Sequence, residues 1–261
     1  MLNINILRIT KKQLLKSLNC GVLVTPNVDH LVKLQKNRAF YNAYQEATHV
    51  VCDSRILYFL SKLTRNPIPE TISGSGFFHK YCELYKDDCG KRFFILGGKA
   101  GVAQKAMDNI NRRLNSHIVV GAHSPSFHID EKESQEIAEI INRSGANIVM
   151  VGLGAPKQEI WITRYKHLMP EVKLWMALGA TVDFEAETQK RAPRSWQRCG
   201  LEWFYRFIRE PRRLFRRYFV EDMKFFWYFG KQLLGFTKIP LNLRPDHSIS
   251  LLFLSTNQQE R

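Results

Sequence analysis

The sequence predicts an α/β protein with a parallel sheet core and a helical C-terminal part rich in basic and aromatic residues. Up to about residue 180, short apolar runs alternate with longer amphipathic segments. This alternation is typical of a parallel sheet whose two faces are covered by helices. Near residue 190 arginine, lysine and aromatic side chains become dense. We therefore expect a core over 1–190, a helical segment over 191–235 and a polar tail over 236–261.

Five apolar runs are expected to form the strands of the sheet. Each is nearly continuous, as is usual for parallel strands that helices cover on both faces. They are GVLVTP (21–26), THVVCD (48–53), KRFFILGG (91–98), ANIVMVGLG (146–154) and KLWMALGA (173–180). Two further candidates are NINILRI (3–9) and SHIVVGA (116–122).

Helices are expected between the strands, and three of them have recognisable first turns. Thr10 with Gln13, and Asp130 with Glu133, match the capping box that opens many helices. Pro156 suits the first turn of a helix, because its missing N–H needs no partner there. The expected helices are 11–19, one from about 28, 54–63, 100–114, 131–144 and 156–168.

The C-terminal helical segment carries just over half of the net positive charge. Residues 190–235 hold 12 lysines and arginines against 4 aspartates and glutamates, which is +8 of the net +15 in under a fifth of the chain. Such a segment attracts polyanions: nucleic acid, an anionic membrane face or a phosphorylated substrate. Pro211 divides it into two expected helices, about 199–209 and 212–234.

Several classes of protein are disfavoured by the composition. No apolar run is long enough to span a membrane, and MLNINILRITKK lacks the layout of a signal peptide. The five cysteines have no CxxC spacing, which favours a reduced cytosolic protein. The histidines form no HxxxH pattern, so we expect no metal site.

Two glycine-containing turns follow strands and precede helices. They are Gly97-Gly98 and Gly152-x-Gly154. Lys157 stands where the dinucleotide fingerprint needs its third glycine, and no P-loop lysine follows. Backbone N–H groups at a helix start still favour an anion, so both turns are candidates for binding a nucleotide or phosphate. The alternative is that they are tight turns and nothing more.

Three polar side chains follow the first two expected strands. Thr25 and Asn27 end the first strand, where hydroxyl and amide groups suit sugar hydroxyls; the alternative is N-capping of the helix from about 28. Asp53 ends the second strand and could act as a general base, or could cap the helix 54–63. Cys52 beside it is interpreted as a small core residue.

Longer motifs resemble one family. VTPNVDHLVKLQKN…VVCD, RFFILGGKAGVAQKA, IVMVGLGAPKQEIWI and ALGATVDFEAETQKRAPRSWQRCGLEWFYRFIREPRR together are similar to the WecB/TagA/CpsF family of bacterial glycosyltransferases. The resemblance covers about residues 3–235. It implies a Rossmann-like core with a C-terminal appendage that closes over the active site. It also implies inverting, metal-independent transfer of a hexose-type sugar from a UDP-sugar, with no cofactor.

The resemblance assigns expected roles to individual residues. Asp53 aligns with the general base, Thr25 and Asn27 with the sugar pocket, and Gln158 with an element near the nucleotide-sugar. Arginines of the appendage align with groups that meet diphosphate; the candidates are Arg191, Arg206, Arg212 and Arg213. The chain departs from the family pattern at Ser54, Thr71 and Gly76, which leaves the identities of both sugars open.

The acceptor implied by the family is a sugar on a polyprenyl diphosphate at the inner face of the cell membrane. Aromatic residues mixed with arginines suit a helix in the lipid headgroup region, so we expect peripheral membrane association; the alternative is that they pack onto the core. These residues are Trp203, Phe207, Phe215, Phe219, Phe226 and Trp227. Self-association is left open.

Two other functions remain as alternatives at this point. A nucleic-acid-binding protein would explain the charge, but no helix-turn-helix, RRM or zinc pattern accompanies it. A Rossmann-type oxidoreductase would explain the glycine turns, but the fingerprint is broken at Lys157. The favoured interpretation is a glycosyltransferase.

Overall fold

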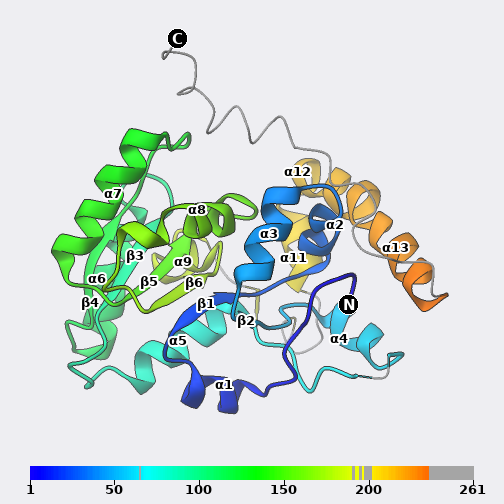
Figure 1. Ribbon diagram of the computed structural model, residues 1–261, viewed down its shortest axis with the longest axis horizontal. Coiled ribbons are helices and arrows are strands. Elements are labelled where there is room, and N and C mark those ends of the chain that lie inside the picture. Colours follow the sequence, from blue (N-terminus) through cyan, green and yellow to red (C-terminus); the bar gives the residue numbers. More distant parts are fainter. Residues whose placement is uncertain (65, 190–191, 194–195, 197–201, 235–261) are drawn as a thin grey trace, which may run out of the picture.

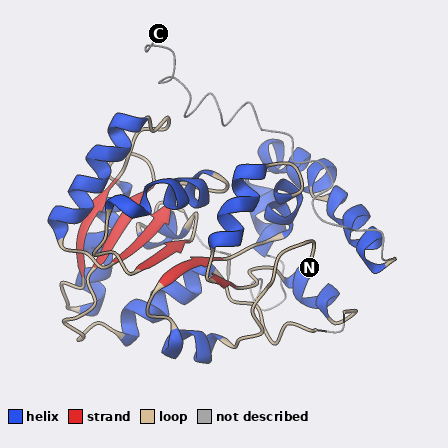
Figure 2. Ribbon diagram, viewed as in Figure 1, coloured by secondary structure: helices blue, strands red, loops and turns tan. Residues whose placement is uncertain are grey.

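The computed structural model describes residues 1–64, 66–189, 192–193, 196 and 202–234, with backbone alone at 202, 203, 206, 213 and 217. A six-stranded parallel sheet lies at its centre, with strand order β2-β1-β6-β5-β3-β4 (Figures 1 and 2). The strands are β1 (Gly21–Val24), β2 (His49–Val50), β3 (Phe93–Gly97), β4 (Val119–His123), β5 (Ile148–Gly152) and β6 (Leu174–Ala177). The predicted parallel α/β sheet is therefore confirmed.

Helices alternate with the strands as the sequence predicted. Those of the core are α1 (Lys11–Ser17), α2 (Val28–Leu34), α3 (Arg38–Glu46), α4 (Arg55–Ser61), α5 (Gly74–Leu84), α6 (Val102–Leu114), α7 (Glu131–Ser144), α8 (Lys157–Tyr165) and α9 (Thr181–Glu185). The Thr10–Gln13 capping box is confirmed at α1, and the Asp130 side chain accepts the Glu133 N–H at α7. A short 3-10 turn, Lys166–Leu168, continues α8 to the predicted end.

Helices cover both faces of the sheet, and alternating strand residues enter two separate cores. In β5, Val149 and Val151 pack with α2, α3, α7 and α8, whereas Ile148 and Met150 pack with α1, α5 and α6. Each strand side chain in these cores is almost wholly buried. Burial on both faces explains why the strands have continuous apolar sequences instead of alternating ones.

The prediction of a strand over 3–9 is wrong. The segment forms one hydrogen bond to the neighbouring strand, from Leu7 N to the Val50 carbonyl oxygen at 2.8 Å. The physical reason is that β2 has only two residues and offers no longer edge to pair with. The apolar side chains of the segment pack instead: Ile4 belongs to the core of the α2 face, as does Leu2 just before the segment.

The C-terminal part contains three α-helices among the described residues. They are α11 (Glu202–Arg209), α12 (Pro211–Arg216) and α13 (Met223–Leu233). Pro211 separates two helical segments, as predicted. The second is not one regular α-helix, because a π-helical turn, Arg217–Glu221, lies between α12 and α13. α13 packs against α2, where Phe225 and Phe229 are buried in the core. The predicted tail over 236–261 lies outside the described residues.

Candidate active site

The carboxyl ends of the strands meet at one edge of the sheet, and the predicted core site residues follow them. β3 and β5 are neighbours in the sheet. The connection after β3 runs to β4 at one edge of the sheet, whereas the connection after β5 runs in the other direction, to β6. The chain therefore leaves these two strands in opposite directions. Open α/β sheets bind their ligands at such switch points. Gly97-Gly98 and Gly152-x-Gly154 both lie at this one, as the sequence placed them at strand ends.

The two glycine turns differ in what surrounds them. A Cβ on Gly97 would lie 2.5 Å from the Gly152 carbonyl oxygen, so the backbones of β3 and β5 approach too closely for any side chain. Gly154 has a φ of +78°, and a Cβ there would have nothing within 4 Å. Close packing thus accounts for Gly97. The space beside Gly154 is available to a ligand, and nucleotide binding by these turns stays a prediction.

Gln158 ties two loops together at the first turn of α8. Its side chain is 2% exposed, and Oε1 accepts the N–H groups of Gly154 at 3.2 Å and Gly179 at 3.0 Å. The loop after β5 is thereby fixed to the loop after β6. Because Oε1 of Gln158 already accepts these two N–H groups, the side chain holds the two loops in place. Its predicted contact with the sugar stays a prediction.

The amide of Gln158 is itself held by a buried carboxylate. Its Nε2 donates to Oε1 of Glu159 at 2.9 Å, and Oε2 of Glu159 has no hydrogen-bond partner among the described residues. Burial raises the pKa of Glu159 to about 7, against the hydrogen bond from Gln158, which lowers it. Asp29, which pairs with Lys33 at 2.9 Å, adds to the increase in the pKa.

Asp53 is not the cap of the following helix. Ser54 caps α4 instead, because its Oγ accepts the Leu57 N–H at 3.3 Å. The Asp53 carboxylate accepts the N–H of Gly74 at 3.3 Å, and the Asp53 N–H donates to the Pro26 carbonyl oxygen at 3.0 Å. The capping alternative for Asp53 is therefore wrong. Cys52 next to it is buried, which raises the pKa of its thiol to about 12, as befits a core residue.

Thr25 directly follows β1, the strand that pairs with β2, which leads to Asp53. β1 and β2 pair with Val24 opposite Val50, which brings the ends of both strands together. Thr25 is buried, and a Cβ on Gly74 would lie 3.4 Å from its Oγ1. Gly74 thus borders both Thr25 and the Asp53 carboxylate. The structure therefore brings these two predicted site residues together.

Asn27 caps α2, which was one of the two interpretations of its position. Its Oδ1 accepts the His30 N–H at 3.1 Å. The cap engages the amide oxygen, so sugar binding by Asn27 would fall to its Nδ2. This second role stays a prediction.

The loop after β6 joins the two halves of the site, although no site residue was predicted at Leu178 or Gly179. Leu178 contacts the position of Gly74 on one side, because a Cβ there would lie 3.1 Å from the leucine side chain. Gly179 donates to Gln158 on the other side. The signal was available, since LGA after the apolar run 173–177 repeats the pattern of the other two glycine turns.

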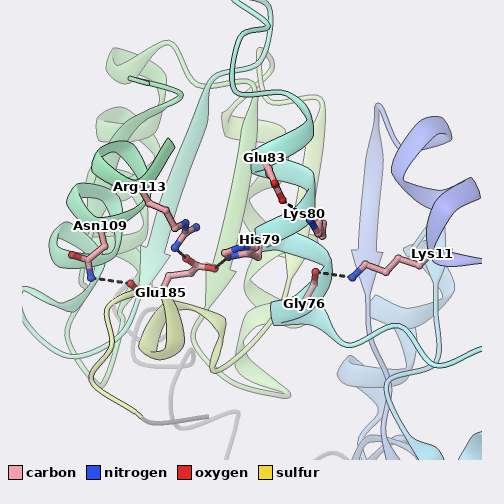
Figure 3. Close-up of polar contacts among 8 residues, drawn as sticks. All are labelled: Lys11, Gly76, His79, Lys80, Glu83, Asn109, Arg113 and Glu185. Atoms are coloured by element: carbon pink, nitrogen blue, oxygen red, sulfur yellow. Dashed lines mark hydrogen bonds and ion pairs between the residues drawn. The ribbon is translucent and has the colours of Figure 1, made fainter. Parts of the chain in front are cut away.

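Hydrogen bonds and an ion pair at Glu185 hold the end of α9, the helix that follows this loop. Glu185 accepts a hydrogen bond from Nη1 of Arg113 at 2.8 Å, and His79 Nδ1 lies 3.5 Å from its other oxygen (Figure 3). Asn109 donates to the Glu185 carbonyl oxygen at 3.0 Å. These partners come from α5 and α6, so the end of α9 is fixed to two neighbouring helices of the same face (Figure 3).

The predicted diphosphate-binding arginines are only partly described. Arg191 lies outside the described residues, as do the side chains of Arg206 and Arg213. Arg212 is exposed on α12. Of the aromatic residues predicted to meet lipid, four have large exposed fractions, which disfavours the alternative of core packing for them; they are Phe215 at 56%, Phe219 at 48%, Phe226 at 44% and Trp227 at 64%.

Comparison with known protein families decides between the functions that remained open. A model described as the glycosyl transferase WecG/TagA/CpsF family matches residues 1–238. This chain belongs to that family. It is a glycosyltransferase of cell-surface polysaccharide synthesis, which uses a nucleotide-sugar donor and a sugar acceptor. The match supports the glycosyltransferase interpretation over the oxidoreductase and nucleic-acid-binding alternatives.

The family assignment agrees with the architecture around the candidate site. A WecG/TagA/CpsF glycosyltransferase has a nucleotide to hold, and a parallel sheet with glycine turns at its switch point suits that task. Within the described residues, no helix has both the length and the hydropathy needed to cross a bilayer.

Proposed function

We propose that this glycosyltransferase moves a hexose-type sugar from a UDP-sugar to a sugar carried on polyprenyl diphosphate. The sugar is a hexose, an N-acetylhexosamine or a uronate, and the transfer inverts its anomeric centre without a metal ion. The observation that carries the proposal is the joined site: Asp53 and Thr25 lie on one side of the Leu178–Gly179 loop and the glycine turns on the other.

Asp53 serves as the general base for the acceptor hydroxyl. Its carboxylate accepts a backbone N–H from Gly74, which sets the direction in which it can receive a proton. When the hydroxyl loses its proton to Asp53, its oxygen attacks the anomeric carbon as the bond to UDP breaks. A one-step displacement of this kind inverts the anomeric centre.

The departing diphosphate needs positive charge or N–H donors. The turns that carry Gly98 and Gly154 lead into α6 and α8, whose N-termini favour an anion. The planar guanidinium of arginine matches phosphate oxygens, so the arginines of the appendage complete the neutralisation. The four candidates are Arg191, Arg206, Arg212 and Arg213. Activity should therefore survive EDTA; a loss that manganese or magnesium restores would argue against this part of the proposal.

The lipid-linked acceptor places the enzyme at the cytoplasmic face of the membrane as a peripheral protein. Exposed aromatic side chains on α12 and α13, such as Phe215 and Trp227, support this, because they stand beside arginines and lysines. The net charge of +15 also attracts the protein to anionic lipids.

The decisive experiment replaces Asp53 with asparagine. Asp53→Asn should abolish UDP release from a UDP-sugar in the presence of a lipid-diphosphate acceptor, because the amide cannot take the proton. Binding of the UDP-sugar, measured by calorimetry, should stay within a few-fold. Ser54→Ala is the matched control: it removes the α4 cap, costs about 1 kcal/mol of stability and leaves turnover largely intact. Unchanged turnover in Asp53→Asn would remove Asp53 from this role.

A further inference from the structure

The helix that follows Asp53 has an apolar face that points to solvent. On α4 and the turn after it, Ile56 is 38% exposed, Phe59 57% and Leu63 66%. The spacings of three and four residues place all three side chains on one face of a helix. Backbone hydrogen bonds from Lys62 N to Phe59 O at 3.2 Å and from Leu63 N to Leu60 O at 3.1 Å continue the helical turn through Leu63.

The opposite face of α4 holds the helix on the protein. Leu57 is fully buried in the core of the α2 face, and Ser61 is 1% exposed. Ser61 Oγ also accepts the Ile68 N–H at 2.9 Å, which ties the following loop to the helix. The helix is therefore firmly seated without any contribution from its outward apolar face, so folding of this chain does not explain that face.

The charged residues of the stretch 54–64 are all positive. Residues 54–64 contain Arg55 and Lys62, both exposed, and no acidic residue. Lys62 Nζ lies 4.7 Å from the centre of the Tyr58 ring and 5.5 Å from that of Phe59, so the ammonium group stands at the border of the apolar face. Arg8 adds a third exposed cation, donating to Asn66 Oδ1 at 3.4 Å.

We propose that this outward face of α4 is a membrane-contact surface. Ile56, Phe59 and Leu63 enter the headgroup region of an anionic bilayer, while Arg55 and Lys62 lie against lipid phosphates. Apolar and aromatic side chains bordered by cations, with no acidic group between them, have the chemistry of a helix that lies in a membrane interface. Figure 1 shows α4 at the same end of the molecule as α13, which carries exposed aromatic residues of its own.

The position of α4 beside Asp53 suggests what a membrane contact there would do for catalysis. This part of the inference rests on the proposed function. α4 begins two residues after Asp53. An acceptor sugar that reaches Asp53 remains attached to a lipid whose chain stays in the bilayer, so the surface bordering Asp53 has to come close to the bilayer. A contact at α4 would hold the site at that short distance.

Vesicle binding by the full chain tests the proposal. Phe59→Ser combined with Leu63→Ser should weaken binding to phosphatidylcholine–phosphatidylglycerol vesicles by about tenfold or more, since two half-exposed apolar side chains are lost. Leu84→Ser is the matched control, because Leu84 is 55% exposed on α5, and its loss should change nothing. Arg55→Gln combined with Lys62→Gln should weaken binding to the anionic vesicles and leave binding to pure phosphatidylcholine unchanged.

Hydrogen exchange locates the contact directly. The amides of 55–64 should exchange more slowly when anionic vesicles are added. Exchange that vesicles leave unaltered, or a double serine variant that binds like the wild type, would overturn the proposal. Protection of 55–64 that rises with protein concentration in the absence of lipid would also overturn it and assign the face to a second copy of the chain.

A kinetic measurement separates this proposal from the proposed function. The double serine variant should lose turnover with an acceptor embedded in vesicles and keep it with a short-chain, water-soluble acceptor. Equal loss with both acceptors would mean that the substitutions damage the site at Asp53, and would overturn the membrane role. If the wild type binds no UDP-sugar, the proposed function fails, while the vesicle and exchange results still decide the role of α4.

Discussion

Replacing Glu159 with glutamine should remove a pH-dependent loss of stability. Glu159 is 1% exposed, and burial raises the pKa of its carboxyl from 4.5 to about 7. In the unfolded chain the same group releases its proton near 4.5. Between these two values the folded state binds more protons than the unfolded state, so the free energy of unfolding falls as pH rises.

The size of this effect follows from the difference in pKa. A pKa difference from 4.5 to about 7 corresponds to a loss of about 3 kcal/mol in the free energy of unfolding. This loss is complete above pH 7 and absent below pH 4.5. Glu159→Gln cannot ionise and should lack this component. Its amide would place an NH2 group where Oε2 has no partner among the described residues, which costs about 1–3 kcal/mol at every pH. The diagnostic quantity is therefore the pH dependence of the difference between variant and wild type.

Urea unfolding followed by tryptophan fluorescence at a series of pH values measures this quantity. The stability of Glu159→Gln relative to wild type should rise by about 3 kcal/mol between pH 4.5 and pH values above 7. Glu171→Gln, at an exposed glutamate, is the matched control and should follow the wild type throughout. Parallel stability curves for Glu159→Gln and wild type would show that Glu159 is not a buried titrating group, and the reasoning would fail.

Three further predictions concern the switch point, the anchor of α9 and the appendage. Gly97→Ala should destabilise the fold by more than about 1 kcal/mol in thermal unfolding, because its Cβ would meet the Gly152 carbonyl oxygen at 2.5 Å; Gly230→Ala, in a helix with open space, should not destabilise it. Glu185→Gln should lower stability by about 1–2 kcal/mol by weakening the bond from Arg113, and an effect near zero would show that the pair is dispensable. Arg212→Gln should reduce turnover about tenfold without changing the melting temperature, since this exposed side chain meets diphosphate in the proposed function; full activity would remove it from that role.

The sequence predicted the core of the fold well because its strands are buried on both faces. A run such as IVMV at 148–151 has few structural alternatives, and β5 occupies 148–152. The structure departs from the prediction where tertiary contacts decide. The apolar segment 3–9 has strand-like composition, but the shortness of β2 leaves it nothing to pair with. The π-helical turn over 217–221 interrupts a run that local sequence alone would continue as a helix.

The candidate site could be predicted in its parts but not in its connections. Strand ends located Thr25, Asp53 and the glycine turns, because side chains and turns with chemical roles gather at the carboxyl edge of a parallel sheet. Sequence spacing could not show that Gly74 borders Asp53 across 21 residues, or that Gly179 bonds to Gln158. It also left Asp53 open as a helix cap, since aspartate and serine are both good caps and only the structure shows that Ser54 takes this place.

The arrangement of the C-terminal helices limits what deletion experiments can show. α9 belongs to the sheet face of α5 and α6, whereas Phe225 and Phe229 of α13 are buried in the core of the α2 face, so the chain changes faces between them. Deleting the chain from residue 192 would remove the predicted diphosphate-binding side chain of Arg212, but would also strip two phenylalanines from the core, at a cost of about 4–6 kcal/mol. That is a large part of the stability of an ordinary domain. Loss of activity after such a deletion would therefore report unfolding as readily as a missing phosphate contact, and substitution of single exposed arginines is the experiment that separates the two.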